Sequence, residues 1–431
     1  MILEFNKFAE AVKRAEKFAS DSPSSKNLLM ESRQGKLVIS FSDGKKNITE
    51  RLECTMEDSD IEERAIVTFE NVKEIITSCT GSGSIQVDSI NLKFDGRDRL
   101  IAEADKYYLG AYPGEENKVY KKLCSHVNKE VKYTRVDDLK GGTILTRFDY
   151  DTIFTTVGES LSSETPADEW EVADLKELFA RVSKNDPKTC FFSSKYKAAY
   201  SMTQASLTFV PIEQDILNGF SMASKVAKNL GEIINSIGGA DTKIQIVTVD
   251  KKFCYMMNTE ETFGIMFELA QATRNDVSTL QRYRSSTYDT YKFRFFKDAL
   301  ADTLKTALSA AKDDNSVLSF QLGKEQIDGK ESDKDELQCV IDRGNASSSI
   351  SKLVLAATEY TDNDEASILD LHIKLNLKVM LDIISNCTQQ YVVFELLKVQ
   401  NSVLIQISDV AGKSDDKYII SAYHYTACMT E

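Results

Sequence analysis

One local arrangement recurs along this chain, and the repetition constrains the fold more than any other feature of the sequence. Each copy has a short strand, a stretch with the apolar spacing of a helix, and then strands with alternating apolar residues. Residues 219–270 show the pattern most clearly: GFSM precedes ASKVAKNLGEIINSIGG, and KIQIVTV, KFCYMM and TFGIMFELA follow. The six helical stretches are predicted at residues 5–19, 69–79, 147–160, 222–237, 296–312 and 374–386.

Six copies of one plan predict three domains with two strand–helix–strand copies each. Each helical stretch carries one apolar stripe, so each helix should lie on one face of an antiparallel sheet. We therefore expect a strand-dominated α+β protein with its helices gathered on one side of the sheets. The predicted domains are residues 1–125, 126–286 and 287–431. Two polar stretches, near 162–188 and 324–349, interrupt the pattern and are interpreted as insertions in the second and third domains.

Length and composition agree with this picture. A chain of 431 residues has room for about three domains, and 42% hydrophobic with 28% charged residues is typical of soluble globular proteins. No apolar run is long enough to cross a membrane, and the amphipathic start MILEFNKFAEAVKRAEKF does not have the form of a signal peptide. The eight cysteines are scattered without a CxxC pair, so we expect a protein of the reducing cytoplasm with no membrane partner.

The sequence offers little support for catalysis. His126, His372 and His424 lie far apart, and none stands at metal-ligand spacing from a cysteine or another histidine. The glycine-containing segments lack the spacing of phosphate-binding loops, and no pair of carboxylates is singled out. We therefore expect no catalytic residue, metal or cofactor. A net charge of −14 argues against nonspecific coating of nucleic acid but allows a local basic surface.

Three segments carry a resemblance to a known family. They are LKFDGRDRLIAEADKYYLGAYP at 92–113, FFSSKYKAAYSM at 191–202 and DVAGKSDDKYIISAYHY at 409–425. Together with the three paired domains, they resemble the β subunit of bacterial DNA polymerase III, the DNA sliding clamp. The resemblance covers nearly the whole chain through patterns rather than one diagnostic motif. The added length of the two polar stretches would fit a divergent or viral version.

The resemblance implies a non-enzymatic processivity factor. Two copies would form a head-to-tail ring around double-stranded DNA, with the helices inside, and would tether the DNA polymerase; a clamp loader is the other implied protein partner. Inward cations would attract phosphates without reading bases. The acidic residues of 147–160 would be the weak point of such a lining. The candidate DNA-binding residues are Lys7, Lys13, Arg14, Lys17, Lys225, Lys228, Lys297, Lys305, Lys312, Lys374 and Lys378, with Lys26 added because the family places a DNA-contacting arginine there.

The family also has a pocket between the second and third domains that accepts a short peptide from polymerase, loader and repair proteins. The matching positions here are Phe192, Ser194, Tyr196, Lys197, Leu280, Tyr283, Ile419 and Ser421. Lys197 and Ser421 stand where the family usually has larger apolar side chains, which predicts a more polar pocket. For contact between the two copies, the candidates are Leu100 and Ala102 on the first domain, facing Leu304 and Leu308 on the third.

Plainer interpretations remain open at this point. The lysines could be ordinary solvated helix residues, and Phe192 and Ile419 could be sheet-core residues. The main alternative function is a monomeric, strand-rich binding or scaffold protein of DNA replication that forms no ring. An enzyme whose site is assembled from distant residues is a third possibility. Oligomeric state separates the ring from the monomer most directly.

Overall fold

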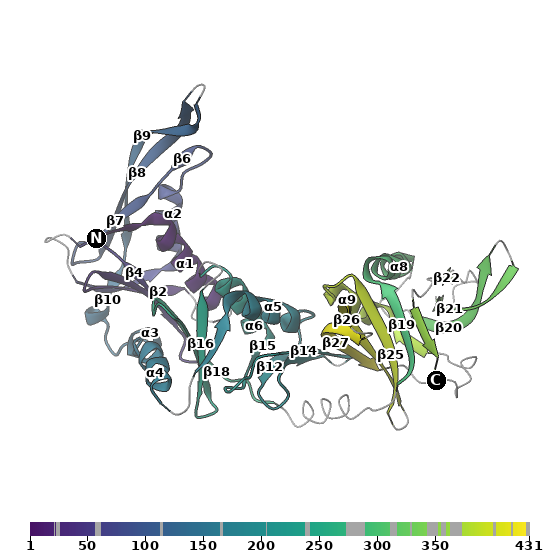
Figure 1. Cartoon of the computed structure of the whole chain (residues 1–431). Coiled ribbons are helices and arrows are strands. Elements are labelled where there is room, and N and C mark those ends of the chain that lie inside the picture. Colours follow the sequence, from purple (N-terminus) through teal and green to yellow (C-terminus); the bar gives the residue numbers. More distant parts are fainter. Residues whose placement is uncertain are drawn as a thin grey trace. The chain divides into compact units, whose positions relative to one another are not determined.

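The structure is a computed structural model of the whole chain (Figure 1). It describes all residues except 21, 23–25, 57–61, 113–114, 164–166, 204, 238–241, 273–288, 311–316, 328–329, 343–351, 355–358, 363–372, 400–401, 415–416 and 428–431. The chain divides into two compact units: unit 1 holds Met1–Glu177 and Lys228–Leu269, and unit 2 holds Leu178–Ala227 and Ala270–Glu431.

Unit 1 contains a smaller sheet at the N-terminal end of the chain. Its order is β1–β7–β8–β6, and β9 pairs with the side of β8 opposite β7, since Leu100 of β8 is paired with both strands. Its strands are β1 (Ile2–Glu4), β6 (Ile85–Gln86), β7 (Ser89–Phe94), β8 (Arg99–Tyr112) and β9 (Glu115–Lys132).

The second sheet of unit 1 has nine strands in the order β10–β5–β2–β3–β4–β18–β17–β16–β11. The central β4–β18 pair joins strands more than 200 residues apart, with Ile48 opposite Ile265. This sheet therefore runs across the predicted boundary between the first and second domains. Its strands are β2 (Asn27–Arg33), β3 (Lys36–Ser42), β4 (Lys46–Glu53), β5 (Arg64–Thr68), β10 (Thr134–Arg135), β11 (Asp168–Glu171), β16 (Lys243–Val249), β17 (Phe253–Asn258) and β18 (Phe263–Glu268).

Unit 2 repeats this plan with a nine-stranded sheet, β15–β12–β13–β14–β27–β26–β25–β19–β23, and a four-stranded sheet, β22–β21–β20–β24. Here the central pair is β14–β27, with Thr208 opposite His424. The strands are β12 (Thr189–Ser193), β13 (Ala198–Met202), β14 (Ser206–Pro211), β15 (Phe220–Ala223), β19 (Asp289–Phe296), β20 (Val317–Ile327), β21 (Lys330–Asp342), β22 (Lys352–Val354), β23 (Glu359–Asp362), β24 (Ile373–Asn376), β25 (Tyr391–Val399), β26 (Ser402–Ser414) and β27 (Lys417–Ala427).

Each of the six predicted helical stretches contains a helix, and α5 (Val172–Ser183) lies outside them. In α1 (Phe5–Ala19), the buried residues recur with each helical turn and form one stripe, and the Thr68 side chain caps the start of α2 (Phe69–Cys79) by accepting from the Asn71 amide. In unit 2, α8 (Lys297–Ala310) and α9 (Leu377–Asn386) share one apolar core. The remaining helices are the 3₁₀ turn η1 (Val136–Asp138), α3 (Ile144–Arg147), α4 (Thr152–Leu161), α5 (Val172–Ser183) and α6 (Ser224–Ile234).

The α+β class, the antiparallel sheets and the repeated order of elements are confirmed. Three times the chain builds the same pair of four-stranded orders: β5–β2–β3–β4 with β1–β7–β8–β9, β15–β12–β13–β14 with β11–β16–β17–β18, and β24–β20–β21–β22 with β19–β25–β26–β27. This repetition supports three domains, although the limits at 125 and 286 stay predictions.

The interpretation of 162–188 as an insertion is wrong. This stretch contains β11 and α5, and β11 joins β16 as β1 joins β7, so it supplies the first strand and helix of the third copy. The helix predicted at 147–160 corresponds to α4, which is the additional element. The second polar stretch, 324–349, is also built into the fold in part, because β20 and β21 extend into it as a paired hairpin.

A strap formed by residues 136–161, with η1, α3 and α4, lies on the face of the nine-stranded sheet opposite α1 (Figure 1). Adjacent residues of a strand point to opposite faces. On β4, Glu50 binds Arg14 of α1, whereas Arg51 binds Asp151 at the start of α4. This sheet is therefore covered on both faces, which departs from the expectation of helices on one side only.

Candidate nucleic-acid interface

Two of the predicted cations on α1 are open to solvent. The side chains of Lys7 and Lys13 are 70% and 75% exposed. Their ammonium groups pair with Glu4 at 3.0 Å and with Glu10 at 3.6 Å, one helical turn away. Exposed ion pairs of this kind contribute little to stability, so both lysines can exchange their carboxylate for a phosphate.

Arg14 and Lys17, in contrast, are engaged within the chain. The Arg14 guanidinium is nearly buried and bonds Glu50 with both arms, at 2.8 and 2.7 Å. Burial raises the pKa of Glu50, and the contact with Arg14 offsets only part of that rise. Lys17 pairs with Glu232. Arg14 is therefore a structural cation, and its assignment to DNA binding is corrected.

Lys26 lies beside a hollow of about 710 Å³ between α1, α2 and β9. Lys73 and Lys129 line the same hollow, together with Glu16 and Glu74. Lys73 pairs with Glu16 at 2.5 Å, and Lys129 with Glu74 at 2.8 Å. No sequence pattern distinguishes Lys73 and Lys129, because only their spatial closeness to Lys26 identifies them.

The remaining predicted cations differ in exposure. Lys225 and Lys228 on α6 and Lys378 on α9 are exposed. Lys305 is 61% exposed and pairs with Asp302, whereas Lys297 is only 24% exposed and pairs with Asp298. Lys374 lies on β24, opposite Ser319, but its side chain is outside the described part of the chain, as is Lys312.

The predicted partner pocket is only partly assembled. Phe192 is a core residue, stacked on Phe220 with ring centres 4.3 Å apart and edge-on to Phe179. Its side chain is thus unavailable to a peptide. The other positions are more open: Ser194 and Lys197 are exposed, Tyr196 and Ser421 are half-buried, and Ile419 is 53% exposed, while Leu280 and Tyr283 lie outside the described residues.

The candidate contact residues between copies are mostly internal. Leu100 and Ala102 on β8 and Leu304 on α8 are fully buried, and Leu308 packs against the core shared by α8 and α9. Leu100, Ala102 and Leu304 therefore cannot face a second copy without loss of their own core. Alternation along β8 was enough to predict an apolar face but not to tell core from interface.

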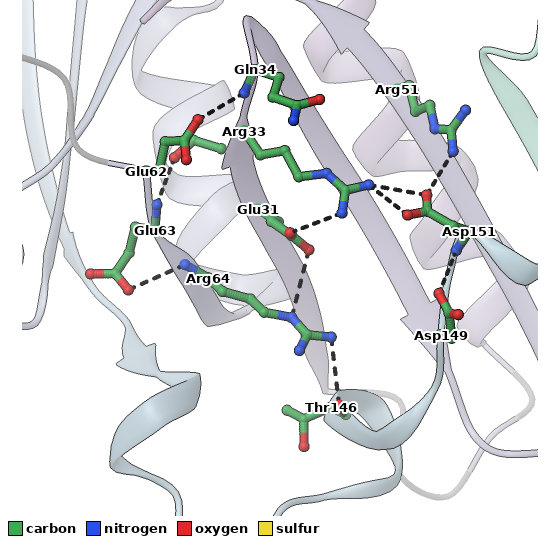
Figure 2. Close-up of polar contacts among 11 residues, drawn as sticks. Glu31, Arg33, Gln34, Arg51, Glu62, Glu63, Arg64, Thr146, Asp149 and Asp151 are labelled. Carbon is green, nitrogen blue, oxygen red and sulfur yellow. Dashed lines mark hydrogen bonds and ion pairs between the residues drawn. The ribbon is translucent and has the colours of Figure 1, made fainter. Parts of the chain in front are cut away.

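The polar network between the strap and the nine-stranded sheet was not anticipated from the sequence (Figure 2). Asp151 accepts hydrogen bonds from Arg33 at 2.8 Å and from Arg51 at 2.6 Å. Although partial burial raises the pKa of Asp151, these two hydrogen bonds outweigh it and hold the pKa below its usual value. The Arg51 guanidinium also lies 3.6 Å from the centre of the Phe154 ring. The network therefore holds the strap on the sheet.

A small hollow of about 320 Å³ lies within this network. Arg64 contacts Glu31 at 3.6 Å and donates to the Thr146 carbonyl at 3.5 Å, so it too connects the sheet to the strap. Acidic and basic side chains alternate around the hollow (Figure 2). Such a balance favours a structural role over capture of an anion.

The described histidines serve structural contacts. His424 is buried, its Nδ1 lies 3.1 Å from the Thr208 hydroxyl, and burial lowers its pKa to about 4. His126 is exposed on β9, with Nδ1 2.8 Å from a carboxylate oxygen of Asp105. His372 lies outside the described residues. Within the described ranges, no three His, Cys, Asp or Glu side chains are grouped as metal ligands would be.

Comparison with known proteins places the fold. No family model matches the sequence, and no curated protein matches it. Solved structures do match: the DNA polymerase β subunit of Streptococcus pyogenes has a TM-score of 0.67 at 11% identity, over 100% of this chain and 99% of that one. The chain has the sliding-clamp fold.

Further clamp structures agree over the same length. The sliding clamp of Pseudomonas aeruginosa gives a TM-score of 0.65 at 12% identity, covering 100% of this chain and 99% of that one. The sliding clamp of Bacillus subtilis gives 0.64 at 10% identity, covering 100% and 98%. At such identities the comparison establishes the clamp fold alone. Among the described helices, none is long and apolar enough to cross a membrane.

Proposed function

We propose that this protein is a DNA sliding clamp, a non-enzymatic processivity factor that closes as a ring of two copies around duplex DNA. The observation that carries the proposal is a repeated sheet junction with two unused edges. In unit 1 the junction is β4–β18, and in unit 2 it is β14–β27. β4 and β14 are the last strands of the first type of four-stranded order, and β18 and β27 are the last strands of the second type. Each junction therefore joins the ends of the two types.

Two strands in equivalent places have no such neighbour among the described residues. They are β9, at the end of β1–β7–β8–β9, and β22, at the end of β24–β20–β21–β22. An unpaired edge tends to recruit another strand. A contact that joins different surfaces head to tail closes into a ring when its rotation is right. If β9 of each copy paired with the β21–β22 edge of the other copy, two contacts would form and all four edges would be paired.

The two edges also differ in charge. Lys121 and Lys122 on β9 are exposed, and next to them Leu123 is 55% exposed. The sequence of β21 starts with KESDKDEL, in which acidic residues outnumber lysines. Complementary charge favours the heterologous pairing over pairing of two β9 edges. This edge replaces the buried residues of β8 as the proposed surface between copies.

For DNA, the main proposed contacts are the exposed helix residues Lys7, Lys13 and Lys228, together with Lys26 in the turn before β2. They would hold phosphates without base contacts, so retention would be topological and independent of sequence. Polymerase and clamp loader are the proposed protein partners, with Tyr196 and Ile419 as the candidate anchors of a partner peptide. The cytoplasm, of a bacterium or of a host if the protein is viral, is the proposed location.

Mass and DNA retention together test the proposal. Light scattering at micromolar concentration should give twice the chain mass of 48.3 kDa. After loading on a nicked circular duplex, the protein should stay bound at high salt and leave once the circle is linearised. A monomeric mass would favour the non-ring binding or scaffold protein, and equal retention on circular and linear DNA would exclude the ring.

A further inference from the structure

The first helices of two repeats carry the same pair of cations at the same positions. Arg14 stands nine residues after Phe5, the first residue of α1, and Arg181 stands nine residues after Val172, the first residue of α5. Three residues further on, the chain has Lys17 in one case and Lys184 in the other. The buried positions match as well: Phe8, Val12 and Ala15 of α1 correspond to Leu175, Phe179 and Val182 of α5.

In unit 1 these cations hold the end of α6. Arg14 donates to the Ser236 carbonyl at 2.9 Å, just beyond the last residue of that helix, while its other arms hold Glu50. Lys17 pairs with Glu232, eight residues after the start of α6. A cation at the C-terminal end of a helix is favoured by the helix dipole.

In unit 2 the equivalent cations hold the end of α9. Arg181 donates to the Thr388 hydroxyl at 2.7 Å, two residues beyond the helix, and to the Ser421 carbonyl on β27 at 2.9 Å. Lys184 donates to the carbonyl of Ser385, which is again eight residues after the start of its helix. Each Arg–Lys pair therefore joins helices of two successive predicted domains: α1 to α6 in unit 1, and the end of α5 to α9 in unit 2. Both contacts lie beside a sheet junction.

The third such helix, α8, lacks the pair. Leu300, Leu304 and Ala307 are buried as Phe8, Val12 and Ala15 are, which fixes the alignment. The positions of the arginine and the lysine are then Thr306 and Ser309. Their hydroxyls donate back into α8, to the carbonyls of Asp302 and Thr306, both at 2.8 Å.

We propose that Arg14–Lys17 and Arg181–Lys184 latch the two junctions inside the chain, and that α8 docks without a latch on the end of α2 of a second copy. This inference rests on the proposed ring. It specifies that α8 of one copy contacts α2 of the other, and it explains why the contact between copies would open before the two junctions inside the chain. By the same spacing, the residue of α2 that corresponds to Glu232 and Ser385 is Thr77, eight residues after Phe69. Thr77 is exposed.

Cross-linking tests the contact. In the full chain with the exposed Cys124→Ser background, Ser309→Cys and Thr77→Cys should form a disulfide between copies under mild oxidation. The matched control moves the second cysteine to Glu74→Cys, one turn back on α2. A cross-linked dimer with Thr77→Cys and little with Glu74→Cys is the expected result. A dimer by light scattering that gives no preferential cross-link would overturn the inference, while a monomer would overturn the ring itself.

Introducing an Arg–Lys pair into α8 tests whether the absence of this pair makes the copies exchange faster. The double variant Thr306→Arg, Ser309→Lys should slow subunit exchange and release from circular DNA by about tenfold, since hydrogen bonds to charged groups are the stronger ones. The control Thr306→Gln, Ser309→Gln has long side chains without charge and should exchange at nearly the wild-type rate. An unchanged exchange rate in the Arg–Lys variant contradicts the missing-latch explanation.

Discussion

Glu50 and Arg51 are neighbours on β4, and each holds a different layer onto the same sheet. Glu50 binds Arg14 of α1 on one face, and Arg51 binds Asp151 of the strap on the other. The strand next to them is β18, which belongs to the second predicted domain. The β4–β18 junction is therefore fixed from both faces, by a helix on one side and by the strap on the other.

The packing of the strap against β18 predicts that position 264 has no room for a side chain larger than that of glycine. A Cβ at this position would lie 2.7 Å from Cγ2 of Ile153 and 3.3 Å from Cζ of Phe154. Gly264→Ala should therefore lower the free energy of unfolding by about 1–3 kcal/mol, measured by urea denaturation. Gly158→Ala on α4 is the control, because nothing lies within 4 Å of its Cβ. That change should be neutral or stabilise by about 0.5–1 kcal/mol. Equal effects of the two changes would contradict the proposed packing.

Sequence patterns were sufficient for the repeated plan but not for the choice between α4 and α5. Both stretches have an amphipathic helix period, and the pattern does not reveal which sheet face a helix covers. Only the pairing of β11 with β16 identifies α5 as the repeated helix. Because the segment before β11 is polar, the sequence pattern places the insertion at 162–188. The additional element is instead the preceding helix, α4.

The individual cations were equally hard to assign. Lys7 and Arg14 are seven residues apart and so lie along the same side of α1. Yet Lys7 is 70% exposed and Arg14 only 11%. The difference comes from Glu50 and from Ser236, which lie 36 and 222 residues away from Arg14. No local pattern contains that information, so a helix-based prediction of DNA contacts included residues that hold the chain together.

The buried His424 predicts a stability change at mildly acidic pH. Burial holds its pKa at about 4 in the folded chain, against an ordinary value of 6.5, with Asp409 acting in the opposite direction and Arg181 and Lys184 adding to the lowering. Between pH 6.5 and 4 the unfolded chain therefore binds a proton that the folded chain does not, and stability falls as the pH falls through this window. The loss amounts to about 3 kcal/mol at most, because each pKa unit corresponds to about 1.4 kcal/mol.

The measurement is urea unfolding from pH 7 to 4 for the wild type and for His424→Gln, which keeps a polar group near Thr208. The wild type should lose more stability than the variant over this range, since both share every other titrating group. Parallel curves for the two proteins would show that the imidazole does not titrate with the expected difference between folded and unfolded states.

Tyr196 and Ile419 should contribute to partner binding without contributing to assembly. Ile419 is 53% exposed at the start of β27, and Tyr196 packs at the margin of the aromatic cluster around Tyr200. Changing both to Ala should leave the dimer mass unchanged and weaken binding of the polymerase by tenfold or more, as loss of apolar anchors typically does. Phe192→Ala is the contrasting variant: it removes a core ring and should lower the unfolding free energy by about 3–5 kcal/mol. Undiminished polymerase binding by the Tyr196–Ile419 variant would place the docking site elsewhere.

Lys7 and Lys13 should account for part of the salt dependence of DNA binding, whereas Arg14, which directly follows Lys13 on α1, should not. Both lysines are mostly exposed and have only surface ion pairs to lose, while Arg14 is bonded to Glu50 and to the Ser236 carbonyl. Changing Lys7 and Lys13 to Ala should weaken binding to short linear duplex and reduce the slope of log K against log salt by about 2, close to one per lost phosphate contact.

Lys243→Ala is the control, because Lys243 lies on β16 and pairs with Glu169. It should leave both affinity and slope unchanged. Arg14→Ala should lower stability while leaving the slope as it is. If the double lysine variant keeps the wild-type slope, the α1 face does not meet the phosphates, and the DNA must be held by the cations of other helices.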